Sequence, residues 1–204
     1  MKQEEKSLLI ALSLGDGYID KQGCIHIEHS QNQKEYLEWK YNLLERLCPS
    51  KRQSNISTRE RLDKRTNKIY KQISCHKQHR YFKIIRKWLY KPEKTYTKYI
   101  LNKLTPQGIA IWYMDDGGLK KNISKVTGKI SSIQLSLYTY CSLSEAKLIQ
   151  DFFIEKYGVE FKIYKHSEKY LLCANTLNGN KFLDLVRPFI IKSMKYKDLN
   201  STNA

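Results

Sequence analysis

The chain has 204 residues and a formal charge of +17 at pH 7, from 37 basic and 20 acidic side chains. A charge of this size attracts a polyanion, because binding releases the counterions that surround phosphates. No run of about 18 apolar residues exists, so we expect no membrane-spanning helix, and the first residues match neither a signal peptide nor a transit peptide. The five cysteines are scattered without a C-x-x-C pair, which is typical of an intracellular protein with reduced thiols.

The N-terminal part of the chain predicts an order of helices and hairpins. An apolar run over 4–15 predicts a buried helix, which Asp16 and Gly17 close. Further elements follow in chain order: a hairpin over 18–30, a helix over 33–47, a hairpin over 52–76 and a helix over 81–90. In the strand 24–30, Ile25 and Ile27 alternate with mostly polar residues, so one face packs on the core and the other stays available.

The C-terminal part repeats this order. Thr105 and Pro106 predict the start of a second buried helix, since a hydroxyl caps a helix and proline fits its first position. This helix runs into Asp115, Asp116 and two glycines, which we expect to end it because glycine turns easily out of a helix. Further elements follow: strands near 119–121 and over 129–138, a helix from Ser142 or Ser144 to Tyr157, a hairpin over 159–175 and a helix over 181–190.

Two spacings indicate that the halves are related. Phe82 and Phe182 stand 100 residues apart and are predicted to begin corresponding helices, and Asp16 and Asp116 have the same offset. A carboxylate at a helix C-terminus gains nothing from the helix dipole and needs a nearby cation. Small residues on the first helix would let the two helices pack closely, and their acids would then form an oxygen-ligand site that suits magnesium. The plainer alternative is a polar helix end followed by a turn.

The two apolar stretches resemble a known motif. Leu9 to Gly17 and Ile109 to Gly117 resemble the two LAGLIDADG motifs of a single-chain homing endonuclease, with the metal-binding acid on Asp16 and on Asp116. Both copies depart from the ideal letters, at 13–15 and at 112–115. The resemblance covers nearly the whole chain. It implies an α+β fold with two pseudo-symmetric halves, 1–104 and 105–204, each helix-β-β-helix-β-β-helix, with saddle-shaped antiparallel sheets and the motif helices packed at the centre.

The resemblance also implies the chemistry. The protein would make a Mg²⁺-dependent staggered double-strand break in a long DNA target and so promote intron mobility. Asp16 and Asp116 would bind about two or three Mg²⁺ ions, some of them shared, with Mn²⁺ as a substitute and the backbone carbonyls of Gly15 and Asp115 as co-ligands. The Asp115 side chain itself is the weaker ligand candidate, and its alternative is a carboxylate at the helix end.

The same family places a lysine near the attacking water or the scissile phosphate. Lys94 and Lys197 resemble these catalytic lysines in position, each in a segment that follows the third helix of its half. Lys195 competes with Lys197. In a chain so rich in lysine, a solvated surface position is the alternative for each.

The outward faces of the four hairpins are expected to bind double-stranded DNA, since a β-ribbon fits the major groove. The contacts predicted in the first half are Lys21, His26, Glu28, Ser30, Arg52, Ser54, Arg59, Arg61, Tyr70 and Gln72. Those predicted in the second half are Lys120, Ser132, Gln134, Ser136, Tyr138, Lys162 and Tyr164. A one-residue slip of strand register would exchange the two faces of a strand.

Two other functions stay open on the sequence. One is an RNA maturase of the same fold, which helps a group I intron to splice, and intron RNA is then a second partner. The other is a sequence-specific DNA-binding protein without catalysis. A zinc site at His26 and His29 is disfavoured, because a spacing of three residues in a strand puts them on opposite faces. We expect an intracellular monomer without membrane contact, in a mitochondrion or other organelle of a eukaryote, or otherwise in bacterial or phage cytoplasm.

Overall fold

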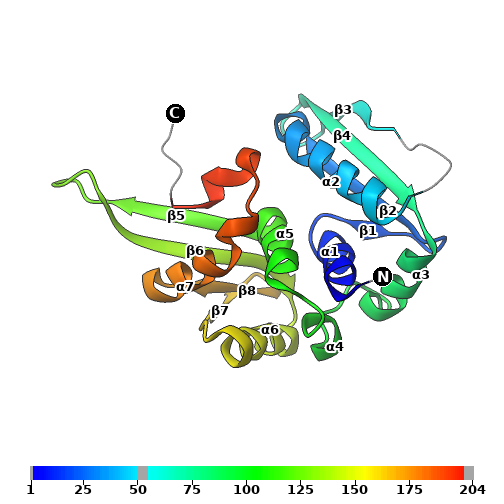
Figure 1. Cartoon of the computed structure of the whole chain (residues 1–204). Coiled ribbons are helices and arrows are strands. Elements are labelled where there is room, and N and C mark those ends of the chain that lie inside the picture. The colour runs from blue at the N-terminus through cyan, green and yellow to red at the C-terminus, as the bar shows by residue number, and fades with distance from the viewer. Residues whose placement is uncertain (1, 50–54, 200–204) are drawn as a thin grey trace.

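A computed structural model describes residues 2–49 and 55–199 of the protein (Figure 1). The first elements are α1 (Gln3–Leu14), β1 (Tyr18–Ile19), β2 (Cys24–Ser30), α2 (Lys34–Leu47), β3 (Ser57–Asp63), β4 (Lys68–Gln78) and α3 (Arg80–Leu89). They are followed by α4 (Lys98–Leu101), α5 (Pro106–Asp116), β5 (Gly117–Ile123), β6 (Ile130–Cys141), α6 (Leu143–Tyr157), β7 (Lys162–His166), β8 (Lys169–Ala174) and α7 (Thr176–Val186). Short 3₁₀ segments include η1 (Gln31–Gln33), η2 (Arg187–Phe189) and η3 (Lys192–Lys197).

The described strands form two four-stranded antiparallel sheets of the same connectivity. Their strand orders are β1-β2-β4-β3 and β5-β6-β8-β7. In each sheet the second strand of the first hairpin therefore pairs with the second strand of the second hairpin. One long helix packs on each sheet, α2 on the first and α6 on the second. In Figure 1 the two sheets lie on opposite sides of the central pair α1 and α5. The predicted α+β class with two pseudo-symmetric halves is confirmed.

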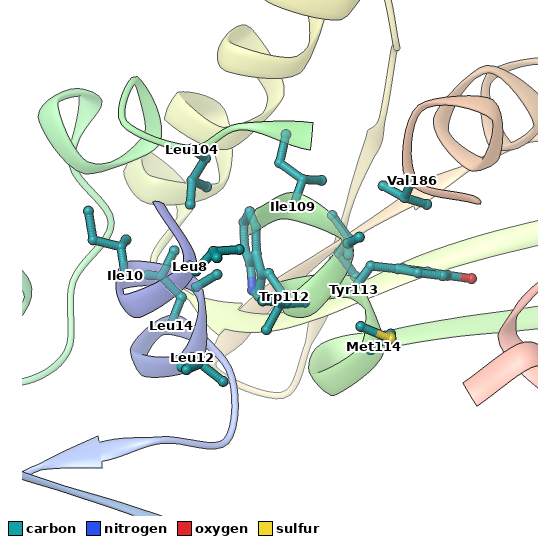
Figure 2. Packing of buried hydrophobic residues seen from close by; sticks show 14 of the residues in the cluster. Leu8, Ile10, Leu12, Leu14, Leu104, Ile109, Trp112, Tyr113, Met114 and Val186 are labelled. Carbon is teal, nitrogen blue, oxygen red and sulfur yellow. The ribbon is translucent and has the colours of Figure 1, made fainter. Parts of the chain in front are cut away.

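The two apolar motif helices form the centre of the molecule. All side chains from Ser7 to Leu14 in α1 and from Gly108 to Met114 in α5 are buried, and the two helices pack against each other. Figure 2 shows Trp112 on the side of α5 that faces α1, whereas Tyr113 points away toward Val186. A helix that is apolar all round needs such burial on every side. None of the helices in the described parts of the chain is long and apolar enough to cross a membrane.

Glycines let the central helices approach each other. A Cβ on Gly15 would lie 2.2 Å from Oδ2 of Asp115, and a Cβ on Gly108 would lie 2.2 Å from Oγ of Ser7. Larger residues would therefore push the helices apart at both positions. Gly117, which we expected to end α5 through its conformational freedom, has a φ of −86° that any residue adopts. Space decides this position too, because a Cβ there would collide with the preceding turn of α5.

Capping residues account for where three of the helices begin. Thr105 caps α5 as predicted, and of the two serines proposed for α6 the cap is Ser142. The predicted start of the last helix at residue 181 is wrong, because the side chain of Asn175 accepts the amide of Asn178 at 3.0 Å and starts α7 directly after it. Phe182 therefore lies within α7, so the expectation that it begins a helix is also wrong.

Candidate active site

Two carboxylates meet at one end of the α1–α5 pair. Asp116 is the last residue of α5, and Asp16 follows the end of α1 by two residues. The pKa of Asp16 is raised to about 6 and that of Asp116 to about 7, chiefly by burial and next by the negative charge of Asp115. Asp16 adds to the rise at Asp116, as neighbouring like charges do. Crowded oxygen donors of this kind fit a divalent cation such as Mg²⁺, which would relieve their repulsion.

Lys94 lies beside the first of these acids. Its Nζ donates hydrogen bonds to the carbonyl oxygens of Leu14, Gly15 and Gly17, at 3.2, 2.9 and 3.1 Å. A bridge between Tyr90 and Lys94 folds the segment after α3 back toward the helix end. Burial lowers the pKa of Lys94, and the surrounding carboxylates oppose this change. These contacts place the Lys94 ammonium at the end of α1 and not in solvent, whereas its role in catalysis stays a prediction.

Lys197 occupies the matching place beside the second acid. Its Nζ donates to the carbonyl oxygens of Met114 and Asp115 at 2.6 and 3.2 Å. The hydroxyl of Tyr113 donates to the carbonyl of Lys197 at 2.8 Å and ties η3 to α5. Burial also lowers the pKa of Lys197. Its competitor Lys195 is exposed, so the structure brings Lys197 and not Lys195 to the acids.

The predicted co-ligand carbonyls of Gly15 and Asp115 are thus hydrogen-bonded to the two lysines. The side chain of Asp115 has a separate role, because it is fully buried. Its Oδ1 accepts hydrogen bonds from Lys40 Nζ at 2.5 Å and from the Tyr36 hydroxyl at 2.6 Å, and its Oδ2 accepts the amide of Asp16 at 3.1 Å. The Asp115 carboxylate is therefore bound within the protein, as its helix-end alternative required.

Asp116 is held by a different group. The indole Nε1 of Trp112, one turn earlier in α5, donates a hydrogen bond to Oδ2 of Asp116 at 3.1 Å. The position 100 residues before Trp112 is Leu12, which has no donor. The two acids thus have similar places in the fold and different partners.

Sequence reasoning missed the polar residues behind Asp16. Lys40 is fully buried, and its Nζ lies 3.0 Å from Nε2 of His29 and 3.7 Å from Oδ2 of Asp16. Burial and the charge of Lys40 lower the pKa of His29 to about 4, so this ring is neutral at pH 7. One signal was present in the sequence, because Lys40 falls on the apolar stripe of α2 between Leu37 and Leu43.

The strand register puts the first set of predicted DNA contacts on one face. His26 pairs with His76, Ser30 and Arg59 both pair with Gln72, and Arg61 pairs with Tyr70. These positions alternate with the buried Ile25, Ile27, Ile73 and Cys75. Glu28 on the same face forms an ion pair with Arg59, and Lys21 is exposed in the β1–β2 turn. Arg52 and Ser54 lie outside the described residues.

The second set also shares a face. Lys120 of β5 pairs with Gln134 of β6, and Lys162 and Tyr164 lie on β7 at the other edge of the sheet, all with exposed side chains. Ser132 is half-buried and accepts a hydrogen bond from the Asn122 amide at 2.8 Å, and Tyr138 is exposed. Ser136 differs, because it is only 7% exposed and lies 3.2 Å from Sγ of Cys173. It is the member of the set that a DNA base would reach least easily.

The two histidines considered for a zinc site, His26 and His29, lie on opposite faces of the first sheet. His26 is exposed on the outward face and His29 is buried on the other, as the spacing predicts. Asp20, Cys24 and His26 bring three ligand atoms within 4.8 Å of one another. There, the Asp20 carboxylate already accepts the amide of Cys24 at 2.9 Å and lies 3.1 Å from Nε2 of His26.

The fold and the paired acids define a class of proteins with two LAGLIDADG helices. The LAGLIDADG DNA endonuclease family matches residues 6–182. The chain therefore belongs to this family.

Individual relatives agree. The chain is 31% identical over 98 residues to a probable intron-encoded DNA endonuclease 3 of Mycosarcoma maydis, which covers 48% of this chain and 66% of that protein. It is 24% identical over 217 residues to a RecA protein of Mycolicibacterium chitae, covering 97% of this chain and 47% of that protein. The match thus spans less than two thirds of these relatives. DNA endonuclease I-ChuI of Chlamydomonas applanata is 23% identical over 97% of this chain and 95% of its own length.

Solved structures confirm the fold. The homing endonuclease I-WcaI bound to its DNA recognition sequence matches with a TM-score of 0.80 and 22% identity, over 96% of this chain and 86% of that one. I-SmaMI bound to an uncleaved DNA target in the presence of calcium ions matches with a TM-score of 0.54 and 11% identity, over 94% and 86%.

Proposed function

We propose that this protein is a site-specific homing endonuclease that makes a Mg²⁺-dependent, staggered double-strand break in a long DNA target and thereby promotes intron mobility. The observation that carries the proposal is the repeated arrangement at the end of the α1–α5 pair. There each motif helix presents one acid, Asp16 or Asp116, with a lysine bonded to the carbonyls just before it. The structures of I-WcaI and I-SmaMI, both bound to DNA, support it.

Asp16 and Asp116 are the proposed metal ligands, with the carbonyls of Gly15 and Asp115 as co-ligands for about two or three ions, Mg²⁺ or in its place Mn²⁺. A bound divalent ion would lower the pKa of a water molecule and stabilise the departing alkoxide oxygen. The raised pKa values of the two acids mean that a proton competes with the ion for each carboxylate. The calcium ions present with I-SmaMI favour divalent metal use here.

Lys94 and Lys197 are proposed to stabilise the negative charge that develops on the scissile phosphate. Each ammonium is fixed beside one acid by backbone carbonyls, so it is oriented before the substrate binds. The outward faces of both sheets are proposed to bind the target. Arginine, glutamine, glutamate and serine side chains there would read bases, whereas lysines would mainly contact phosphates.

We further propose that one chain acts as a monomer, with halves 1–104 and 105–204 each contacting one part of the target. The packing of α1 on α5 supports this, because both acids come from the same chain. Intron RNA as a second ligand and an intracellular, organellar setting are predictions from composition and family resemblance.

The test is cleavage of a plasmid library with a randomised site, in Mg²⁺, in Ca²⁺ and in EDTA. We expect sequence-specific linear products with Mg²⁺ alone, whose ends reveal the site and the stagger. The absence of cutting in Mg²⁺ and Mn²⁺, together with salt-sensitive binding to RNA or DNA, would replace this proposal with the maturase or the binding protein.

A further inference from the structure

The halves differ at one buried position behind the active site. Helices α2 and α6 correspond, because each lies between the two hairpins of its half. Four buried positions have the same spacing, at 37, 40, 43 and 44 in α2 and at 146, 149, 152 and 153 in α6. In this alignment Lys40 corresponds to Ile149, and both side chains are fully buried. A charge therefore occupies a place that is apolar in the other half.

Lys40 is surrounded by groups that attract a cation. Its Nζ lies 2.5 Å from Oδ1 of Asp115, 3.0 Å from Nε2 of His29 and 3.7 Å from Oδ2 of Asp16. An ammonium has only donors, so Nε2 of His29 accepts, and its Nδ1 carries the proton toward Oε1 of Gln33 at 3.1 Å. The ring is thus oriented as a ligand toward Lys40.

The same three residues have the composition of a metal site. One ligand atom each from Asp16, His29 and Asp115 lie within 4.8 Å of one another. The Lys40 ammonium is bonded to two of the three and faces the third. A buried ion pair of this kind contributes little net stability, but it fixes which groups face each other.

The Asp115 carboxylate links Lys40 to Asp16. One oxygen of its carboxylate accepts Lys40 and the other accepts the amide of Asp16 at 3.1 Å. Gly15 leaves the room for this carboxylate, since a Cβ there would lie 2.2 Å from Oδ2 of Asp115. The reverse contact cannot form, because Gly15 has no side chain to reach Asp116.

We propose that Lys40 is a positioning residue for the Asp16 side of the active site: its ammonium occupies the cation position among Asp16, His29 and Asp115. Through Asp115 it fixes the backbone of Asp16, and it keeps a divalent ion out of this inner cluster. The Asp16 carboxylate is then left to the ion site that it forms with Asp116. This inference rests on the proposed function for its effect on cleavage, but not for its effect on metal binding.

The first experiment needs no DNA. Co²⁺ is titrated into the wild type, into Lys40→Met and into Lys40→Met with His29→Gln, and binding is followed by visible absorption and calorimetry. Methionine fills the space of the lysine stem without its charge. We expect Lys40→Met to bind one Co²⁺ more than the wild type, with a spectrum of histidine coordination that the added His29→Gln removes. Equal stoichiometry in wild type and Lys40→Met would overturn the proposal even if the protein cuts DNA.

The second experiment uses the target found for the wild type, with a different label on each strand. We expect Lys40→Met to change the ratio of the two strand-cleavage rates at least about tenfold at saturating enzyme. Its affinity for the target should stay within about threefold of that of the wild type. The matched control is Ile149→Met, which should leave this ratio unchanged. If the ratio is unchanged in Lys40→Met, including the case in which both strands are cut more slowly by the same factor, the positioning role is overturned.

A third variant covers a failure of Lys40→Met to fold. Lys40→Met with Asp115→Asn removes both charges of the buried pair, so no unpaired carboxylate is left inside. We expect it to fold with the strand ratio still altered, because the ammonium beside Asp16 is absent. A return to the wild-type ratio would show that Lys40 only balances the charge of Asp115, and would overturn the positioning role.

Discussion

The two halves of this protein share one architecture and hold their proposed catalytic acids in two ways. Asp116 is held within its own helix, by the Trp112 indole. Asp16 is held across the interface between the halves, by Asp115 of α5, which in turn depends on Lys40 of α2. A repeated fold thus supplies repeated positions, whereas the side chains behind each acid have diverged.

The close approach of the two central helices accounts for this difference. The helices approach so closely at Gly15 that only one of the two positions, 15 or 115, can carry a side chain. Once that side chain is a buried carboxylate, it needs a cation and hydrogen-bond donors, because an unpaired buried charge is very costly. Lys40 and Tyr36 supply them from the first half only.

The largest effect is expected where the halves are most alike. Asp16→Asn or Asp116→Asn should each lower cleavage at least about 10³-fold, because each removes a proposed metal ligand and with it several kcal/mol of transition-state stabilisation. Binding to the target should change little, as measured by fluorescence anisotropy in Ca²⁺. Full-rate cutting by either variant would remove that aspartate from the mechanism.

Stability measurements compare the two halves at Lys40 and at Ile149, the corresponding positions of α2 and α6. Lys40→Met leaves Asp115 buried without its cation, so we expect the free energy of unfolding to fall by about 3–5 kcal/mol. Ile149→Met replaces one apolar side chain with another and should cost less than about 1.5 kcal/mol. Urea unfolding measures both. Similar losses in the two variants would contradict the asymmetry of the buried charge.

The proposed catalytic lysines test whether the two halves contribute equally to cleavage. Lys94→Met and Lys197→Met should each lower the cleavage rate about a hundredfold, since each removes a fixed ammonium beside one acid. Lys195→Met is the control, because this exposed neighbour has the same charge and should leave the rate unchanged. A loss with Lys195→Met as large as that with Lys197→Met would point to overall charge and not to position.

The smallest effect is expected in how the free energy of unfolding of the metal-free protein depends on pH. The folded pKa values of Asp16 and Asp116, about 6 and about 7, lie above the ordinary value of 3.8. The folded state thus binds more protons, and stability is lost as pH rises from about 4 through about 7. Asp116→Asn should reduce this loss more than Asp16→Asn, because its pKa is raised further. Urea midpoints in EDTA at pH 5 and pH 7.5 provide the measurement.

Added Mg²⁺ should oppose the same loss at pH 7.5 in the wild type, because the ion binds the ionised carboxylates of the folded state. The double variant Asp16→Asn with Asp116→Asn should show neither the pH-dependent loss nor the gain from Mg²⁺. A gain of equal size in that variant would place the ion elsewhere.

Most of the fold could be predicted from local patterns. The apolar runs before Asp16 and Asp116, the alternation at Ile25 and Ile27, and the cap at Thr105 each depend on residues near in the chain. The start of the last helix was predicted wrongly, because Asn175 was assigned to the preceding hairpin, whereas its side chain caps α7. The lysines Lys94 and Lys197 were found only through the family resemblance, since nothing local distinguishes them from the other surface lysines.

Periodicity, spacing and composition were enough to predict the two related halves, the pair of acids and the positive charge that suits DNA, because these are local or additive properties of a chain. The outward strand face at Gln72 and Gln134 and the burial of Ser136 could be read only from the fold, since strand register depends on pairing between distant strands. The bond between Lys40 and Asp115, 75 residues apart, is likewise visible only in the folded structure. A buried ion pair depends on the packing around it and not on the neighbouring residues in the sequence.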